Sequence, residues 1–189
     1  MSTQILSPAD APIAPAGVWN IDPSHSTIGF SVKHMMIATV RGHFTEFAGS
    51  ITIDDASGTV ISGIVQAGSI DTNEPQRDEH LRSGDFFDAA NYPQILFTST
   101  GIERRGDGQY ALVGDLTIKD VTRQVTLDAT VNGEGVDPWG NQRLALEARG
   151  QINRKDYGLN WNQLLETGGV LVGEKVTITL DLSTVRAAA

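Results

Sequence analysis

Residues 26–34 read STIGFSVKH, a stretch in which apolar side chains alternate with small or polar ones. A period of two is typical of a β-strand with one buried face, because successive side chains of a strand point to opposite sides. The apolar face would carry Ile28, Phe30, Val32 and, at the strand end, His34. The stretch therefore predicts a half-buried strand, and most of the chain follows the same pattern.

Further strand candidates show this period of two along the chain. They cover residues 40–54, 59–71, 94–103, 110–120, 122–132, 143–153 and 175–185. Turn-forming segments separate them, as at residues 55–58, 105–108 and 137–140. About eight strands joined by short polar turns predict a mainly β fold, an antiparallel sandwich or barrel.

The parity of the apolar residues changes within residues 40–54. Phe44 lies on one parity, whereas Phe47 and Ile51 lie on the other. One extra residue moves every later side chain to the opposite face of a sheet. We therefore expect a bulge or sharp bend near Thr45 and Glu46.

Residues 74–93, EPQRDEHLRSGDFFDAANYP, break the strand pattern. Pro75 suits the first position of a helix and Gly84 suits its end. Asp85 is expected to cap a second short turn that carries bulky apolar residues. This pattern predicts a short helical insertion that covers one end of the β structure.

The composition excludes several classes of function. The net charge is −9, from 14 Lys and Arg against 23 Asp and Glu in 189 residues, so we expect no nucleic-acid partner. No apolar run approaches the roughly 20 residues that span a bilayer, so we expect no stable membrane insertion. The chain has no cysteine, which excludes disulfides and thiolate chemistry.

The N-terminal residues 1–17 differ from the rest. They carry no Lys or Arg and are interrupted by Pro8, Pro12 and Pro15. A secretory signal needs a positive region followed by a continuous apolar one. We therefore expect a flexible leader over 1–17, a single domain over 18–189 and a cytoplasmic location.

Four histidines raise the question of a metal site: His25, His34, His43 and His80. The first three are nine residues apart, which places neighbours on opposite faces of a regular strand. We interpret His25 as a turn residue bonded to neighbours such as Asp22, and His43 as outward-facing. His34 shares the apolar parity and is either a polar ligand contact or a histidine satisfied by the protein. We expect no metal and no cofactor.

Arg77, His80 and Arg82 form the densest mixed charge of the chain, together with Asp78. They are candidate head-group contacts, because guanidinium groups match phosphate oxygens. The alternative is a solvated helix face on which Asp78 pairs with Arg82.

The sequence offers no catalytic motif of the GxSxG, HExxH or P-loop type, so we expect a protein that is not an enzyme. Two alternatives stay open. One is a metal-binding protein or enzyme that uses His34 and His80, and the other is a structural interaction domain without a ligand.

The segments WNIDPSHSTIGFSVKH, VRGHFTEFAGSI, RDEHLRSGDFFDAANYPQILFTST, GDLTIKDVTRQVTL and INRKDYGL together resemble the YceI-like family. They cover nearly everything after the leader, in the family's order. The resemblance implies a lipocalin-like antiparallel eight-stranded barrel with an elongated apolar pore. It also implies a polyisoprenoid-binding role, with quinone-like or fatty-amide ligands in other relatives, and it suggests a homodimer.

We therefore expect the protein to bind a long-chain isoprenoid or related lipid in an apolar lumen, as a carrier, store or buffer. Parity and resemblance together predict the ligand contacts Phe30, Val32, Phe44, Leu81, Phe86, Phe87, Leu96 and Leu116, with His34 as a polar contact.

Overall fold

The structure, a computed structural model, describes residues 13–189. Residues 1–12 of the expected leader lie outside the described residues, and the cytoplasmic location stays a prediction. Residues 13–17 lie against the β structure, because Ala14 is buried and Trp19 Nε1 donates to the Pro15 carbonyl at 3.1 Å. The packed chain therefore begins before the expected domain start at residue 18.

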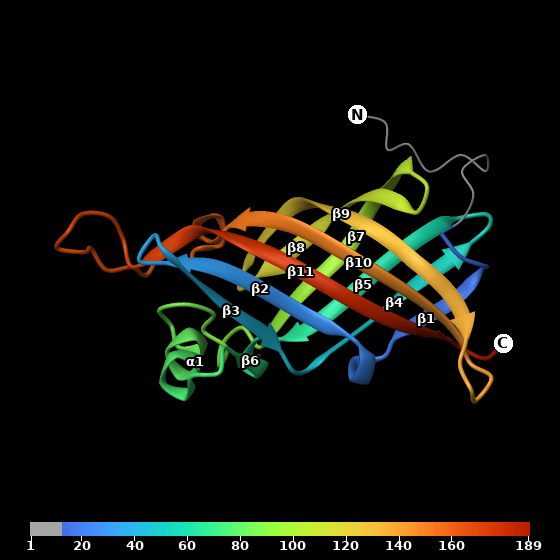
Figure 1. Ribbon diagram of the computed structural model, residues 1–189, viewed down its shortest axis with the longest axis horizontal. Coiled ribbons are helices and arrows are strands. Elements are labelled where there is room, and N and C mark those ends of the chain that lie inside the picture. The colour runs from blue at the N-terminus through green and yellow to red at the C-terminus, as the bar shows by residue number, and fades with distance from the viewer. Residues whose placement is uncertain (1–12) are drawn as a thin grey trace.

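Within residues 13–189, eleven strands form one antiparallel sheet that closes on itself (Figure 1). They are β1 (Gly17–Ile21), β2 (Thr27–His34), β3 (Ala38–Phe44), β4 (Phe47–Asp54), β5 (Gly58–Gln66), β6 (Ile70–Asp71), β7 (Gln94–Gly106), β8 (Gln109–Ile118), β9 (Val121–Val136), β10 (Gln142–Asn153) and β11 (Val172–Arg186). The order is β1-β4-β5-β7-β8-β9-β10-β11-β2-β3-β6, and a further pairing of β1 with β11 closes the ring. The expected barrel is confirmed, and this closure excludes the sandwich.

Three walls of the barrel each consist of two strands in line, which reduces the eleven strands to eight walls. β1 and β2 both pair with β11 and form the first of these walls. Their partners β4 and β3 form the second wall. The strands β5 and β6, which pair with β4 and β3, form the third. The break between β3 and β4 lies at Thr45 and Glu46, whose amides donate to the Ser69 carbonyl and hydroxyl oxygens at 3.1 and 3.0 Å. The expected bend is confirmed.

The helix α1 (Pro75–Arg82) begins with Pro75, as expected, and the Glu74 carboxylate caps it by accepting from the Arg77 amide at 2.6 Å. Asp85 does not cap the following turn, contrary to expectation. Its carboxylate instead lies 2.8 Å from His80 Nε2. Figure 1 shows α1 beside β6 at one end of the elongated barrel. No helix within residues 13–189 has the length and apolarity needed to cross a bilayer.

In the described part of the chain, three 3₁₀ helices interrupt the strands: η1 (Pro23–His25), η2 (Ala67–Ser69) and η3 (Arg154–Tyr157). The barrel interior has a filled part and a hollow part. The filled part is a buried cluster around Trp19, Ile51 and Leu144, all of them at most 1% exposed. The hollow part lies further along the same barrel, and its wall also includes residues of β1 and β10.

Candidate functional site

An apolar cavity of about 220 Å³ occupies the barrel. Its wall residues come from strands around the whole ring, from α1 and from the segment that follows α1. On β11 they run from Val172 to Leu182, which corresponds to about 30 Å of strand at about 3.3 Å per residue. The cavity is therefore long as well as apolar.

The apolar residues predicted as ligand contacts all border this cavity: Phe30, Val32, Phe44, Leu81, Phe86, Phe87, Leu96 and Leu116. Their contact with a lipid stays a prediction. Leu96 differs from the others, because it is 39% exposed and alternates with the more buried Ile95 and Phe97. Strand alternation assigns the Leu96 side chain to the outer surface. The expected contact of Leu96 with a ligand therefore stays a prediction that its exposure does not favour.

The sequence interpretation missed the cavity wall on β9, β10 and β11. These strands contribute Val125, Leu127, Leu146, Ala148, Ile152, Val176, Ile178, Leu180 and Leu182. Their period of two was visible in the sequence. Which face of β9, β10 and β11 points into the barrel depends on how the barrel closes. The local sequence pattern does not contain that information.

On β10 and β11, the wall residues of the cavity extend as far as a pair of leucines. Leu146 and Leu182 face each other across β10 and β11, are each 5% exposed and border the cavity. Two residues further along β10 and β11, on the side away from the cavity, Leu144 pairs with Thr184. Both are fully buried, and the Thr184 hydroxyl donates to the Leu144 carbonyl at 3.0 Å. On β10 and β11, Leu146 and Leu182 therefore lie between the cavity and the filled core, and Ile21 of β1, the partner of Thr184, also borders the cavity.

Residues 74–93 cover the cavity from the side of α1, and buried polar contacts hold this covering segment in place. Asp78 is 6% exposed and accepts from the Thr72 amide at 2.9 Å and from the Thr72 hydroxyl at 2.5 Å. Arg77 donates to the same hydroxyl at 2.7 Å and to the Thr72 carbonyl at 2.8 Å. Leu81, three residues after Asp78 in the same helix, borders the cavity.

The guanidinium of Arg82 donates to the carbonyls of Gly68 and Ile70 at 2.7 and 3.0 Å. Arg77 and Arg82 therefore anchor α1 on backbone carbonyls, and neither borders the cavity. The suggested Asp78–Arg82 ion pair is wrong, because Asp78 bonds Thr72 instead. Contact of both arginines with a ligand head group stays a prediction. Their hydrogen bonds to the protein do not favour it.

His80 packs between two aromatic rings. Its ring centroid lies 4.7 Å from that of Trp161 and 5.2 Å from that of Phe86, both edge-on. Its Nε2 faces the Asp85 carboxylate. These contacts fix the orientation of Phe86, a wall residue, so His80 supports the covering segment from outside the cavity.

His34 lies at the end of β2, paired with Ala38 of β3 and Val172 of β11. It is half-buried and, unlike Val32, is not among the wall residues of the described chain. A register shift in β11 between Val172 and Val176 falls beside it. Its role as a polar ligand contact stays a prediction.

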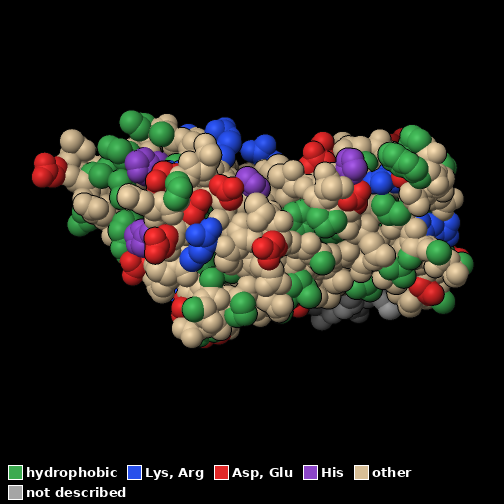
Figure 2. Space-filling view, turned by 90° about the horizontal axis from the view of Figure 1, so that it is seen from below, with side chains coloured by type: hydrophobic (Ala, Val, Ile, Leu, Met, Phe, Trp, Pro, Cys, Tyr) green, Lys and Arg blue, Asp and Glu red, His purple; other side chains and the backbone are tan. Residues whose placement is uncertain are grey.

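The turn that follows His34 is apolar and exposed. Met35, Met36 and Ile37 are 44, 61 and 80% exposed, and Leu164 on the neighbouring loop is 81% exposed. Figure 2 shows apolar side chains at this end of the molecule and interspersed acidic and basic side chains elsewhere on the same face. No extended basic patch is visible on that face among the described residues.

Arg154 is a wall residue that the sequence did not single out. It is 4% exposed and begins η3. Its guanidinium donates to backbone carbonyls of four residues: Gly173 (2.8 Å), Leu159 (2.6 Å), Trp161 (2.9 Å) and Val172 (3.2 Å). Burial lowers the pKa of Arg154, whereas the charge of Glu174 raises it. An arginine in a short polar turn is ordinarily exposed, so no sequence signal marked it.

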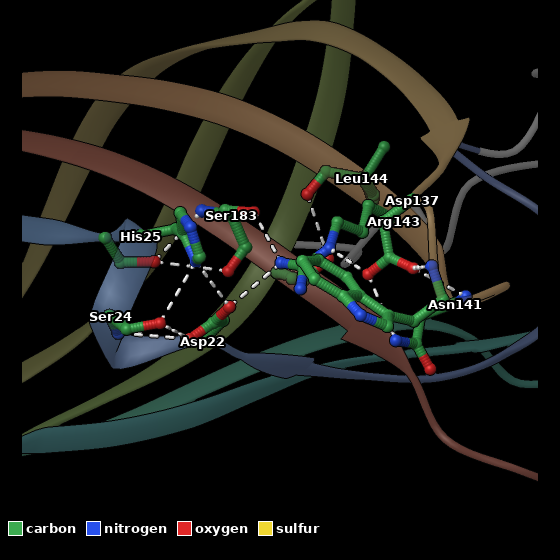
Figure 3. A network of polar contacts seen from close by, with 11 residues as sticks. Asp22, Ser24, His25, Asp137, Asn141, Arg143, Leu144 and Ser183 are labelled. Carbon is green, nitrogen blue, oxygen red and sulfur yellow. Dashed lines mark hydrogen bonds and ion pairs between the residues drawn. The ribbon is translucent and has the colours of Figure 1, made fainter.

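A second polar network lies around η1 (Figure 3). His25 Nδ1 lies 2.8 Å from Asp22 and 3.0 Å from the Ser24 hydroxyl, while that hydroxyl donates to Asp22 at 2.6 Å. A catalytic Ser–His–Asp triad uses different ring nitrogens for the serine and the aspartate. Here one nitrogen faces both, and the interpretation of His25 as a turn residue agrees with this geometry.

Arg143 connects this turn to the β9–β10 turn. It donates to Asp22 at 2.9 Å and to Asp137 at 2.8 Å. Hydrogen bonds from Ser24, Arg143 and His25 hold the pKa of Asp22 far below its usual range. The hydrogen bond from Arg143 does the same for the pKa of Asp137. Within residues 13–189, no three His, Asp or Glu side chains converge as a metal site.

Comparison with known proteins gives consistent matches. The YceI-like domain model matches residues 19–184. A UPF0312 protein of Yersinia pestis and Protein YceI of Escherichia coli O157:H7 are each 39% identical over 137 residues, which is 71% of this chain and 71% of theirs.

Solved structures share the fold. BcnA of Burkholderia cenocepacia has a TM-score of 0.74 at 24% identity, over 86% of this chain and 98% of its own. A domain from Saccharophagus degradans described as polyisoprenoid binding has a TM-score of 0.69 at 15% identity, over 92% and 100%.

Proposed function

The chain belongs to the YceI-like family, and from this premise we propose that it binds a long-chain isoprenoid or related amphiphilic lipid in its barrel. The proposed role is that of a carrier, store or buffer. The observation that carries the proposal is the long apolar cavity, whose wall on β10 and β11 reaches Leu146 and Leu182 and which residues 74–93 cover.

A lipid chain in this cavity would be held by the hydrophobic effect. Each CH₂ equivalent removed from water contributes about 0.8 kcal/mol. About 30 Å of apolar wall along β11 can therefore retain a long chain without an ion pair. The polyisoprenoid-binding description of the Saccharophagus degradans domain supports the same class of ligand.

The proposal describes a binding protein and not an enzyme. His34 and His80, the residues of the alternative metal or catalytic site, lie in different environments. His80 faces Asp85 and two aromatic rings, whereas His34 lies at the β2–β3 turn. The homodimer that the family resemblance suggests stays a prediction, which analytical ultracentrifugation can check.

The test is mass spectrometry of an organic extract from natively purified protein, with metal analysis alongside. We expect a stoichiometric prenyl or acyl species and no stoichiometric metal. An extract without lipid, together with bound zinc or iron, would overturn the proposal. Protein stripped of lipid should also take up a fluorescent long-chain probe, and prenyl lipids should displace it.

A further inference from the structure

The β2–β3 turn and the loop 162–171 expose large apolar side chains, which we call the apolar tip: Met35, Met36, Ile37 and Leu164. The turn and the loop pack against each other. The Met35 amide donates to the Leu171 carbonyl at 2.8 Å, and a methyl group at Gly169 would lie 3.6 Å from Met36 Cγ. Apolar side chains that are exposed together mark a surface that contacts a protein partner or a membrane.

The backbone of the turn is strained at two residues of the apolar tip. Met35 and Met36 have φ values of 53° and 65°, in the left-handed region that favours glycine and asparagine. The Ile37 amide donates to the His34 carbonyl at 3.2 Å, which makes this a two-residue hairpin turn whose preferred sequence is Asn-Gly. Methionine at both positions therefore costs stability, and strain of this kind is typical of functional segments.

The apolar tip lies at the end of the cavity that is remote from the filled core. On β2 and β11 the cavity wall extends to Val32 and Val172. His34, which precedes the turn, pairs with Val172, and Val172 follows the loop. Figure 1 shows the turn and the loop projecting at the end of the barrel where α1 lies. Whatever the apolar tip contacts is therefore close to this end of the cavity.

Size and charge indicate what covers the apolar tip. A stable protein interface takes about 20–30 residues a side, whereas the tip has four side chains on two narrow loops. Peripheral membrane binding needs less, because its strength scales with the apolar area buried among the lipid head groups. Residues 34–40 contain no Asp, Glu, Lys or Arg, and Glu166 is the one such residue in 159–173. Glu166 and the net charge of −9 oppose anionic lipids, so a neutral membrane surface fits best.

Building on the proposed lipid binding, we propose that the apolar tip docks the protein reversibly on a zwitterionic lipid bilayer, and that the bound lipid enters and leaves the barrel at this end. The apolar side chains enter the head-group region, and the barrel stays outside the bilayer. This docking is peripheral and differs from the insertion of a spanning segment. Because the hydrophobic effect drives it, it persists at high salt.

The first test is flotation of the purified protein with phosphatidylcholine vesicles at low and at high salt. We expect at least as much bound protein at high salt as at low salt. Replacing part of the phosphatidylcholine by anionic phosphatidylglycerol should weaken binding at low salt, because the protein is acidic. No binding to phosphatidylcholine, or binding that requires the anionic lipid, would overturn the docking.

The double variant Met35→Asn with Met36→Gly separates docking from folding, because it gives the turn its preferred sequence. We expect vesicle binding to fall at least about tenfold with the loss of two apolar side chains. The midpoint of urea denaturation should stay the same or rise, since the strain is relieved. If the methionines serve only the fold, the midpoint falls and vesicle binding stays unchanged.

Trp139→Ser is the matched control. Trp139 is 82% exposed, like Ile37, but it lies on the β9–β10 turn at the opposite end of the barrel. We expect Ile37→Ser to weaken vesicle binding and Trp139→Ser to leave it unchanged. The chain has no cysteine, so Ile37→Cys and Trp139→Cys each accept one polarity-sensitive fluorophore. Vesicles should shift the emission of the label at position 37 to the blue and leave that at position 139 unchanged, and the reverse result would overturn the docking.

Transfer of a fluorescent prenyl lipid from vesicles to protein connects docking with lipid binding. In the double variant we expect transfer to be at least about tenfold slower, with the amount bound at equilibrium unchanged. Transfer at the wild-type rate would overturn the docking and leave lipid binding intact. Vesicle binding without any uptake of lipid would instead overturn the proposed function. An oligomer that Ile37→Ser dissociates, in a protein that binds no vesicles, would assign the apolar tip to a second copy of the chain and overturn the docking.

Discussion

Phe30 lies in the cavity wall, with its ring centroid 5.8 Å from that of Phe44. Phe30→Glu would place a carboxylate in this apolar surface, and burying an unpaired charge costs several kcal/mol. We expect retained lipid to fall at least about tenfold, since each 1.4 kcal/mol changes affinity tenfold. Mass spectrometry of extracts measures the loss, and the β circular-dichroism spectrum should persist. Thr27→Glu, on the exposed face of the same strand, should retain lipid. Equal retention in both variants would show that Phe30 does not contact the ligand.

Single residues differ in how far the sequence predicts them. Ile28, Phe30 and Val32 border the cavity as their parity predicts, because β2 is regular there. His34 continues that parity but lies where the pairing with β11 shifts register, so strand alternation alone does not place it. Arg154 could not be predicted, since its partners are carbonyls brought together by the fold from residues up to 19 positions away.

The position of the helix α1 depends on one buried hydroxyl group, that of Thr72. The Thr72 hydroxyl donates to Asp78 and accepts from Arg77. Thr72→Val keeps the shape but leaves the buried Asp78 with one donor fewer, which should lower the free energy of unfolding by about 1–3 kcal/mol. Urea denaturation measures the change. Glu79→Ala, an exposed position on the same helix, should stay within about 0.5 kcal/mol of the wild type. A Thr72→Val effect no larger than this control would contradict the anchoring role.

The Arg143 network links two turns and should make stability depend on pH. The folded-state pKa values of Asp22 and Asp137 are depressed, so their contribution is present above the unfolded value of about 4 and is lost as the pH falls below it. Arg143→Gln should lower stability at neutral pH and flatten this acid dependence. Unfolding free energies measured from neutral to acid pH test it, and parallel curves for wild type and variant would contradict it.

The sequence predicts the boundaries of strands and helices where residues close together in the chain determine them. The break at Thr45 and Glu46 was readable because the parity of the flanking phenylalanines changes there. The role of Asp85 was not, because its partner His80 comes from the preceding helix and competes with the expected cap. The packing of the folded chain determines which of two neighbouring partners the Asp85 carboxylate binds.

The strand patterns alone do not determine whether the sheet closes into a barrel. Alternation is the same in a sandwich and in a barrel, and the choice between them came from the family resemblance. In the structure, closure rests on the register of Trp19 with Arg186 and of Ile21 with Thr184, residues from opposite ends of the chain. The same closure determines which face of β9, β10 and β11 is the inner one.

The closed interior should also limit the length of the proposed lipid chain, because the cavity wall on β10 and β11 extends only as far as Leu146 and Leu182. Leu182→Ala should deepen it, at a cost of about 2–5 kcal/mol in the lipid-free protein that a longer chain can partly offset by filling the space. We expect the copurified lipids to shift toward longer chains, as measured by mass spectrometry of the extract. Asp181→Ala, at the exposed neighbouring position of β11, should leave the distribution as in the wild type. If Leu182→Ala retains the wild-type distribution despite a folded barrel, the leucine pair is not the end of the chain-binding site, and the chain must instead stop nearer the covering segment.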